Sequence, residues 1–390
     1  MSLGLPYSMR LAGFPLGLLL LIGVAYVTDY SIILLIKGGS MSGTNTYQSL
    51  VSKMFGFPGY LLLSVFQFLY PFAVSPESWY VDRRVLIVLT TAVITLPIAL
   101  YRNMEKLGKV SLLSLLLTFT VLVIIIVRAS SLTSEIPHTE DAWVFAKPNV
   151  MQAVGVMSFV FMCHHACFLI YGSLEKATVS NWSRITHVSM LLSLFISLQY
   201  SVFGYVSFTG FTQGDLFENY CREDNLATIG RFCYAITIIL TYPMECFVAR
   251  EVISNVFFGG NLSYTLHFAV TFAVVSLTTA FSLVYDCLGM FLELNGILSA
   301  TPLVFIIPPA CYLKLSEKPW YHLDNAIPLL ILLLGMVIMP VGFLMAILYP
   351  QECSHGSEMF YCLSTNSTLL NITSESFYRM TLISLTGKGN

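Results

Sequence analysis

Apolar runs of membrane-spanning length follow one another along most of this chain, and short polar segments separate them. A helix needs about 20 predominantly apolar residues to cross the hydrocarbon core of a bilayer. Lipid offers no partner to backbone N–H and C=O groups, so helices, which satisfy these groups internally, are the default for such runs. The pattern therefore predicts an all-α multi-pass membrane protein with ten spanning helices, at 11–36, 57–74, 85–101, 110–129, 150–172, 187–209, 228–249, 263–285, 288–313 and 326–349.

The polar segments predict the domain organisation and the orientation. We expect one transmembrane domain over residues 1–349 and a polar tail over residues 350–390. If the first span runs inwards, the inside loops hold ten Lys and Arg residues, and the outside loops and membrane margins hold six, in agreement with the positive-inside rule. Two N-glycosylation sequons, at Asn366 and Asn371, also favour an extracellular or lumenal tail.

Composition agrees with this class and excludes others. The chain is 56% hydrophobic and 10% charged, whereas soluble domains are about 45–50% apolar and about 25% charged. With a net charge of −2 and no long basic stretch, nucleic-acid binding is not expected. The sequence shows no convergent acid–base pair, metal-binding motif or nucleophile elbow, so neither an enzyme nor a bound cofactor is expected.

The nine cysteines divide between apolar and polar segments. Six lie in or beside spans, where a cysteine is typically a small buried apolar residue. Cys221, Cys353 and Cys362 lie in polar segments. The last two lie in the tail, and an oxidising compartment on that side would allow them to form a disulfide.

Glycine and proline interrupt several spans. Transporters place substrate and coupling ions near the middle of the bilayer, where helices unwind and expose backbone groups. Membrane helices also tolerate Pro and Gly as simple kinks, so a single one is weak evidence. In this chain they gather at the N-terminus and in two later spans, at Gly4-Leu-Pro6, Gly13-Phe-Pro15, Thr241-Tyr-Pro243, Asn295-Gly296 and Thr301-Pro302.

Two adjacent histidines lie in the span 150–172, within MSFVFMCHHACFLIYGSLE. His164 and His165 are about 100° apart around a helix, so one helix face does not present both to a metal ion. Cys163 and Cys167 share a face, but two thiols alone make a weak metal site. Three interpretations remain open, namely a proton relay, ordinary packing and a local break that lines a polar cavity.

Three carboxylates, Asp29, Glu245 and Glu293, lie in or close to spans. A carboxylate that faces lipid is strongly unfavourable, so we expect each to face the protein interior or a membrane margin. Functional and structural roles are equally compatible with Glu245 and Glu293. Asp29 lies between Thr28 and Tyr30, and a structural role is expected for it.

Five longer stretches resemble one known family: GLPYSMRLAGFPLG, MSFVFMCHHACFLIYGSLE, FTGFTQGDLFENYC, RFCYAITIILTYPMECFVAREVI and LELNGILSATPLVFIIPPACYLKL. They are similar to the sodium-coupled neutral amino acid transporters, a branch of the amino acid and auxin permease group. The resemblance covers nearly the whole chain. It implies a sodium-driven symporter of neutral amino acids that works by alternating access, most consistent with the plasma membrane, with no cofactor beyond the coupling ion.

The resemblance also implies eleven helices in two inverted five-helix repeats. These would occupy about 1–129 and 150–313, with an extra helix at 326–349. The first and sixth helices of that fold are unwound at the centre and hold the substrate. The sixth corresponds to 150–172, which makes Ser158, Phe159, Cys163 and His164 the substrate-site candidates. A Thr in the helix matching 228–249 helps to hold sodium in relatives, which points to Thr241, with Thr237 one turn before it.

Two departures from the family pattern bear on activity. Family members have an Asn-containing segment with a Gly-Ser-Gly-like break before the Leu-Pro-Tyr-Ser motif, whereas this chain reaches that motif directly from Met1. The third helix is also shortened, because Val74-Ser75-Pro76 follows Pro71-Phe72. First and third helices are thus expected to be truncated, as in a short splice form or an incomplete gene model. The alternative function is therefore a non-transporting amino acid sensor or an inactive truncated isoform.

Overall fold

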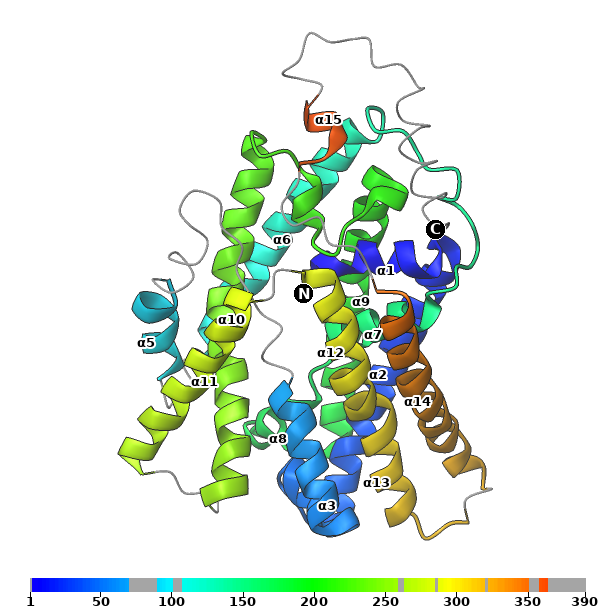
Figure 1. Cartoon of the computed structure of the whole chain (residues 1–390). Coiled ribbons are helices and arrows are strands. Elements are labelled where there is room, and N and C mark those ends of the chain that lie inside the picture. Colours follow the sequence, from blue (N-terminus) through cyan, green and yellow to red (C-terminus); the bar gives the residue numbers. More distant parts are fainter. Residues whose placement is uncertain are drawn as a thin grey trace, which may run out of the picture.

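The regular structure of the chain is helical, as the apolar runs predict. The computed structural model describes residues 2–69, 90–100, 107–258, 263–284, 287–319, 322–350 and 358–363, and no strand occurs within these ranges. The helices form a bundle in which α15 (Phe360–Leu363) lies at one end and α3 (Tyr47–Leu69) and α13 (Ile307–Leu315) reach the other (Figure 1). The short helix α1 (Leu5–Ala12) lies across the bundle between them (Figure 1). The expected all-α multi-pass membrane class is therefore confirmed.

Eight helical segments of the described part are long and apolar enough to cross a membrane. An additional helix, α11 (Tyr264–Val284), has a shorter apolar stretch over Tyr264–Ala280. Of the predicted span 85–101, the structure describes only residues 90–100, which form the short η3 (Thr91–Thr95) and α5 (Leu96–Ala99). The eight segments are Phe14–Ser42, Tyr47–Gln67, Ser111–Leu132, Val150–Gly172, Val179–Phe211, Asn225–Phe258, Leu288–Leu315 and Leu323–Leu348.

The first predicted span, 11–36, contains a corner that the apolar pattern does not show. The helix α1 (Leu5–Ala12) follows the short turn η1 (Ser2–Gly4) and ends at Gly13, and α2 (Phe14–Ser42) begins immediately after it. Gly13 has φ of 89°, a left-handed conformation that glycine adopts without steric cost. A Cβ at Gly13 would also lie 2.8 Å from the carbonyl oxygens of Val144 and Phe145, so the corner requires glycine.

The second predicted span starts ten residues too late. The helix α3 (Tyr47–Leu69) begins within a polar stretch and bends at Gly56. One face of this stretch packs into the protein, where Tyr47, Gln48, Leu50 and Val51 are buried. Gln48 and Gln67 are both buried, and Gln48 Nε2 donates a hydrogen bond of 2.8 Å to Gln67 Oε1.

Two of the eight segments are both interrupted and deeply buried. Val150–Gly172 consists of α7 (Val150–Phe161) and α8 (His164–Gly172). Leu288–Leu315 consists of α12 (Leu288–Asn295), two π-helical segments and α13 (Ile307–Leu315). The most apolar window of each is 72% buried, compared with 22% for α14 (Leu323–Leu348). The interrupted helices therefore form the interior of the bundle, and α14 lies at its edge.

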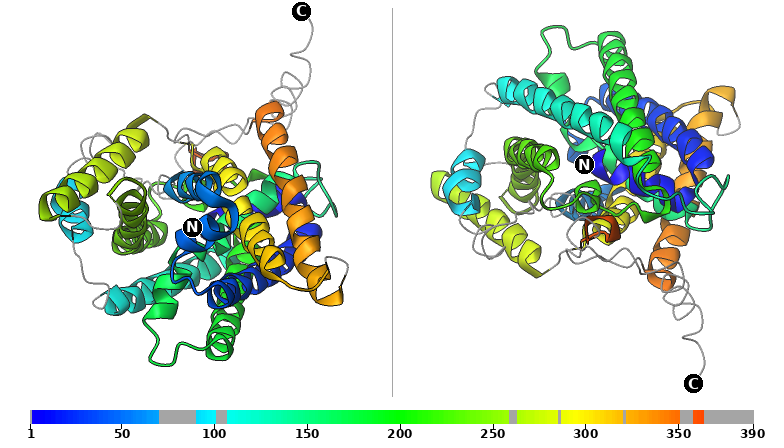
Figure 2. Two further views of the ribbon diagram at one scale, coloured as in Figure 1. Left: turned by 90° about the horizontal axis from the view of Figure 1, so that it is seen from below. Right: turned by 90° about the horizontal axis from the view of Figure 1, so that it is seen from above.

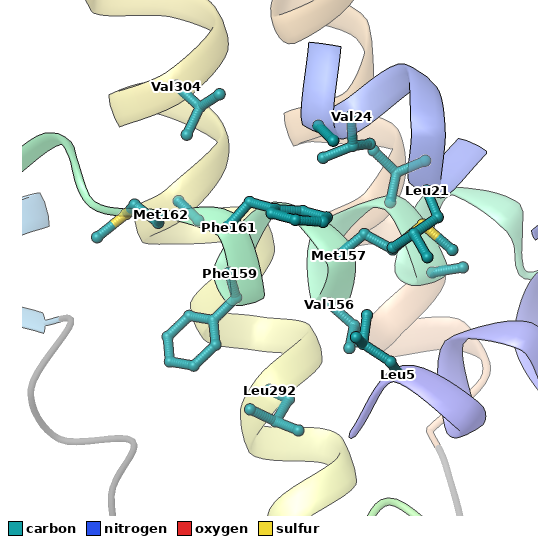
Figure 3. Close-up of a cluster of buried hydrophobic side chains, with 14 of the residues drawn as sticks. Leu5, Leu21, Val24, Val156, Met157, Phe159, Phe161, Met162, Leu292 and Val304 are labelled. Carbon is teal, nitrogen blue, oxygen red and sulfur yellow. The ribbon is translucent and has the colours of Figure 1, made fainter. Parts of the chain in front are cut away.

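Small residues and apolar side chains join these interior elements. Gly155 of α7 meets Gly296 at the start of the π-helical segment η7 (Gly296–Ala300), where a Cβ on Gly296 would lie 2.1 Å from the Gly155 carbonyl oxygen. Small residues allow membrane helices to approach this closely. Beside this contact, Leu5 of α1, Val156 of α7 and Leu292 of α12 pack in one cluster (Figure 3).

A second, smaller apolar core lies at one side of the molecule. It contains residues of α5, α11 and α10 (Asn225–Phe258), which lie together in both axial views (Figure 2). Arg250 of α10 is buried beside this core, where Nη1 donates to the Ala99 carbonyl oxygen at 3.0 Å and to Thr271 Oγ1 at 3.1 Å. The guanidinium thus satisfies a carbonyl at the end of α5, so we assign it a structural role.

The segment between α9 (Val179–Phe208) and α10 is tied to the tail by a disulfide that differs from the predicted one. Cys362, in the short helix α15 (Phe360–Leu363), is bonded to Cys221 in the loop between α9 and α10. The predicted Cys353–Cys362 pair is therefore wrong, and Cys353 itself lies outside the described residues. Proximity in sequence favoured Cys353, whereas the folded chain brings together two residues separated by 141 positions. Asn366 and Asn371 also lie outside the described residues, so their glycosylation stays a prediction.

Replacing Cys221 with Ser is expected to lower the thermal unfolding temperature of the purified protein. Closing a loop this long typically contributes about 2–4 kcal/mol, largely by restricting the unfolded chain. Peptide mapping without reductant should recover Cys221 linked to Cys362. Recovery of Cys362 linked to Cys353 would contradict the structure, and Cys233→Ser, a change at a free cysteine, serves as control.

The loop between α9 and α10 contains a buried acidic residue outside the spans. Burial raises the pKa of the Asp215 carboxyl to about 6, and nearby Glu218 adds to this, although the amide of Phe217 donates a 2.9 Å hydrogen bond to Asp215 Oδ1. A carboxyl with a raised folded-state pKa binds its proton more tightly when folded. Its contribution to stability is therefore fully present below about pH 4 and is lost as the pH rises through 6.

Wild-type protein should consequently gain stability relative to Asp215→Asn when the pH falls from 7 to 5. The expected difference is about 1 kcal/mol, because the amide of Asn does not titrate. Thermal unfolding at both pH values measures it. An equal pH response in the two proteins would show that Asp215 titrates normally.

Candidate functional site

The interruption between α7 and α8 places two helix ends against each other inside the bundle. Met162 is extended, with ψ of 121°, and Cys163 has φ of −139°. Helices leave the carbonyls of their last turn and the N–H groups of their first turn without partners within the helix. Some are satisfied locally, since the Met162 amide donates to Phe159 O at 3.3 Å and the Ala166 amide to Cys163 O at 3.0 Å. The negative end of α7 and the positive end of α8 therefore meet at the break.

The predicted substrate-site residues lie on both sides of this break. Ser158 and Phe159 belong to the last turns of α7 and are fully buried, and Ser158 Oγ donates to Val154 O at 2.6 Å. The Phe159 ring points away from Leu21 and Val24 of α2, whereas Phe161 lies towards them (Figure 3). Cys163 is half-buried at the start of α8. The structure thus places these three candidates at one interruption, and the fourth, His164, is the first residue of α8.

His164, the fourth candidate, is fully buried and has a defined tautomer. Its Nε2 lies 3.1 Å from Ser31 Oγ of α2, and Ser31 Oγ donates its only hydrogen to Val304 O at 2.5 Å. His164 Nε2 must therefore be the donor to Ser31, which leaves Nδ1 as an acceptor. Nδ1 has no hydrogen-bond partner among the described residues. A buried acceptor without a partner beside the break is available to an ammonium group.

His165 points to a different helix from its neighbour. Its Nε2 lies 3.3 Å from Glu245 Oε2 of α10, and both side chains are largely buried. The two adjacent histidines therefore contact different helices: His164 contacts α2 and His165 contacts α10. This geometry also agrees with the expectation that the pair does not chelate a metal ion, because the two rings lie against different elements.

The predicted sodium-site residues lie on α10, one turn apart. Thr237 Oγ1 donates to Cys233 O at 3.0 Å, and Thr241 Oγ1 donates to Thr237 O at 3.0 Å. Pro243, inside the same helix, has no N–H, so the carbonyl of Ile239 lacks its usual helical partner. Both hydroxyl hydrogens are used within α10, but the oxygen lone pairs remain available. The structure does not bring these threonines into contact with the break, so their role stays a prediction.

A buried carboxylate lies where α1, α7 and α12 meet. Glu293 of α12 accepts a hydrogen bond of 2.5 Å from Tyr7 Oη and one of 3.1 Å from Gln152 Nε2. Gln152 Nε2 also lies 3.4 Å from the carbonyl oxygen of Tyr349, at the end of α14. The sequence indicated Glu293 as a candidate but gave no sign of Tyr7 or Gln152, since residues 286 positions apart show no pairing in one sequence.

Asp29, for which a structural role was expected, lies against a histidine of another helix. Its Oδ2 lies 2.7 Å from Nδ1 of His187, and the pair joins α2 to α9. His187 is about half exposed, and its Nε2 lies 3.1 Å from Ser183 Oγ. The pair lies between α2 and α9 rather than at the break, so we assign it a packing role.

A helical membrane bundle with an interrupted helix in its interior is an architecture that many membrane transporters use. Comparison with known sequences identifies the family. The sequence model described as "Transmembrane amino acid transporter protein" matches residues 1–349. The chain therefore belongs to the transmembrane amino acid transporter family.

Individual relatives agree with this assignment. Proteins from Bos taurus and Homo sapiens, both named "Putative sodium-coupled neutral amino acid transporter 11", are each 58% identical to this chain. The alignments cover 98% of this chain and 88% of the bovine protein, and 96% of this chain and 97% of the human protein. A vacuolar amino acid transporter 2 from Saccharomyces cerevisiae is 25% identical over 92% of this chain and 81% of its own length.

Replacing Ser31 with Ala is expected to destabilise the protein by about 1–3 kcal/mol, because His164 Nε2–H would be left buried without an acceptor. Thermal unfolding measures the effect. Ser201→Ala is the matched control, since Ser201 is equally buried and its Oγ bonds only within its own helix, to Ser197 O at 2.8 Å. Equal losses in the two variants would contradict the proposed Ser31–His164 link.

Proposed function

We propose that this chain is a sodium-coupled symporter that moves neutral amino acids across a membrane by alternating access, with the substrate bound at the α7–α8 break. The observation that supports this most directly is the pair of opposed helix ends beside the buried acceptor of His164. The names of the mammalian relatives, which specify sodium coupling and neutral amino acids, point the same way.

The break suits a zwitterion. The N–H groups at the start of α8 would receive the substrate carboxylate, because helix N-termini favour anions. The carbonyls at the end of α7, together with His164 Nδ1, would receive the ammonium group. The two charges of a zwitterion thus meet the two opposite helix ends.

A neutral substrate side chain fits the residues beside the break. Ser158, Phe159 and Cys163 have no cationic or anionic side chain, and the nearby Glu245 carboxylate already faces the imidazole of His165 at 3.3 Å. An additional charge on the substrate side chain would lie in a low-dielectric interior without a counter-ion, which is strongly unfavourable.

Sodium is proposed to bind beside Pro243 of α10. Hydroxyl oxygens of Thr237 and Thr241 and the carbonyl of Ile239, which Pro243 leaves without a helical partner, are the hard oxygen ligands that suit a small cation. We propose that bound sodium stabilises the outward-open state, and that its inward gradient drives the cycle.

The tail is proposed to lie outside the cell or in a lumen, and the plasma membrane is the proposed location. The Cys221–Cys362 disulfide supports this orientation, because structural disulfides persist in oxidising compartments. The positive-inside count of the loops supports the same orientation. We further propose two inverted repeats, about 1–129 and 150–313, with α1 of the first packed on α7 of the second in the interior.

Uptake of a labelled panel of neutral amino acids, including glutamine and alanine, tests this proposal. Cells expressing the chain should take up substrate in sodium medium and at least about fivefold less in choline medium. Thr241→Val should raise the half-saturating sodium concentration, because it removes a ligand oxygen. Thr279→Val, which loses a similar intrahelical hydroxyl bond on α11, is the control and should leave that concentration unchanged.

Surface expression measured in the same cells decides what a negative result means. Equal uptake in sodium and choline would contradict sodium coupling. Absence of uptake at normal surface amount, with amino acids still raising the unfolding temperature, would instead favour the alternative of a non-transporting sensor.

A further inference from the structure

Two buried carboxylates hold the two halves of the interrupted helix separately. Glu293 accepts a hydrogen bond from Gln152 of α7, and Glu245 pairs with His165 of α8. Within the described ranges, no Lys or Arg forms an ion pair with either carboxylate. Each half of the helix is therefore joined by a polar contact to an element that is not part of the break.

The Glu293 contact lies towards the outer side. Gln152 also reaches the carbonyl of Tyr349, which precedes the tail, and Arg10 of α1 donates to Thr212 O of the outer loop at 2.9 Å. The side chain of Glu293 is only 1% exposed, and Tyr7 donates to it from α1. One carboxylate thus ties the outer ends of α1 and α7 to α12.

The Glu245 contact lies towards the inner side. The helix α10 begins at Asn225, just after the disulfide loop, so Glu245 lies about 30 Å along its axis from that end. His165 is in the first turn of α8, which follows the break and leads to the inner side. The second carboxylate thus ties the inner half of the helix to α10.

Separating either contact requires water. Glu293 would lose the hydrogen bonds from Tyr7 and Gln152, and the largely buried Glu245 would lose the imidazole of His165, which lies 3.3 Å away. Either carboxylate would then retain an unfavourable desolvation energy unless water replaced these partners. Opening the outer contact would therefore admit water between α7 and α12, and opening the inner contact would admit it between α8 and α10. The two openings lie on opposite sides of the break, and both contacts are closed in this structure.

We propose that Glu293 and Glu245 are positioning residues that latch the outer and the inner half of the interrupted helix, so that alternating access consists of releasing one latch while the other is closed. This inference rests on the proposed transport function for its physiological role. Neither carboxylate is proposed to touch the substrate. Each acts by holding one half of the interrupted helix, α7 or α8, in place. Two chemically identical substitutions are therefore expected to have opposite effects.

The native thiol of Cys163, half-buried at the break, reports which side is open. A membrane-impermeant, charged thiol reagent is applied to intact cells for the outer side and to inside-out vesicles for the inner side. Modification is quantified on the Cys163 peptide by mass spectrometry, with Cys163→Ser as the background. Glu293→Gln should raise the modification rate from outside by at least about fivefold, and Glu245→Gln should raise it from inside by a similar factor.

Three further variants make the result interpretable. Tyr7→Phe removes one donor to Glu293 and should act in the same direction as Glu293→Gln, even if that variant folds poorly. His165→Asn should likewise follow Glu245→Gln. Glu251→Gln removes another partly buried carboxylate of α10 and should leave both rates unchanged.

Unchanged rates, an increase from the same side in both carboxylate variants, or an equal increase in Glu251→Gln would overturn the proposal. The measurement needs no flux, so it separates two failures. Altered labelling without amino acid uptake would support the two latches and contradict the transport proposal. Sodium-dependent uptake with unaltered labelling would reject the latches alone.

Discussion

The constraint on which this structure depends is that lipid satisfies no backbone hydrogen bond, so an unwound helix must be enclosed by protein. The break at Met162 and Cys163 meets this condition, because it belongs to one of the two most buried spans. The surrounding helices enclose it, and α14 and α9 expose much more of their surface. We propose that the enclosed helix ends and the unpartnered Nδ1 of His164 form the polar site that binds a zwitterion in this apolar interior.

The same constraint organises the buried side chains. In a low-dielectric interior an unpaired polar group is unfavourable, and several buried polar side chains around the break find their partners on other helices. His164 joins α8 to α2, Glu293 joins α12 to α1 and α7, and Glu245 joins α10 to α8. These contacts converge on the two halves of one interrupted helix. Substrate binding, ion coupling and gating are therefore proposed to act through the same few elements.

The sequence predicted the features that depend on local composition. Apolar runs predicted the helical membrane class, and the residues around His164 indicated the span that is broken. Features that depend on long-range pairing could not be predicted in this way. Cys362 bonds to a residue 141 positions away, and Tyr7 reaches Glu293 across 286 positions. The start of α3 was misplaced because the buried pair of Gln48 and Gln67 makes a polar stretch helical. A single sequence shows none of these partners.

The central claim is that the α7–α8 break binds the amino acid. The most direct test is protection of the Cys163 thiol from alkylation by unlabelled substrate, measured on the purified protein in sodium buffer with Cys163→Ser as the background. Binding at the break predicts that a neutral amino acid slows modification of Cys163 in a saturable manner, while the rate at the other half-buried thiol, Cys233, stays constant. A Cys163 rate that is independent of amino acid concentration, in protein shown to bind the amino acid by thermal shift, would contradict the claim and move the binding site elsewhere.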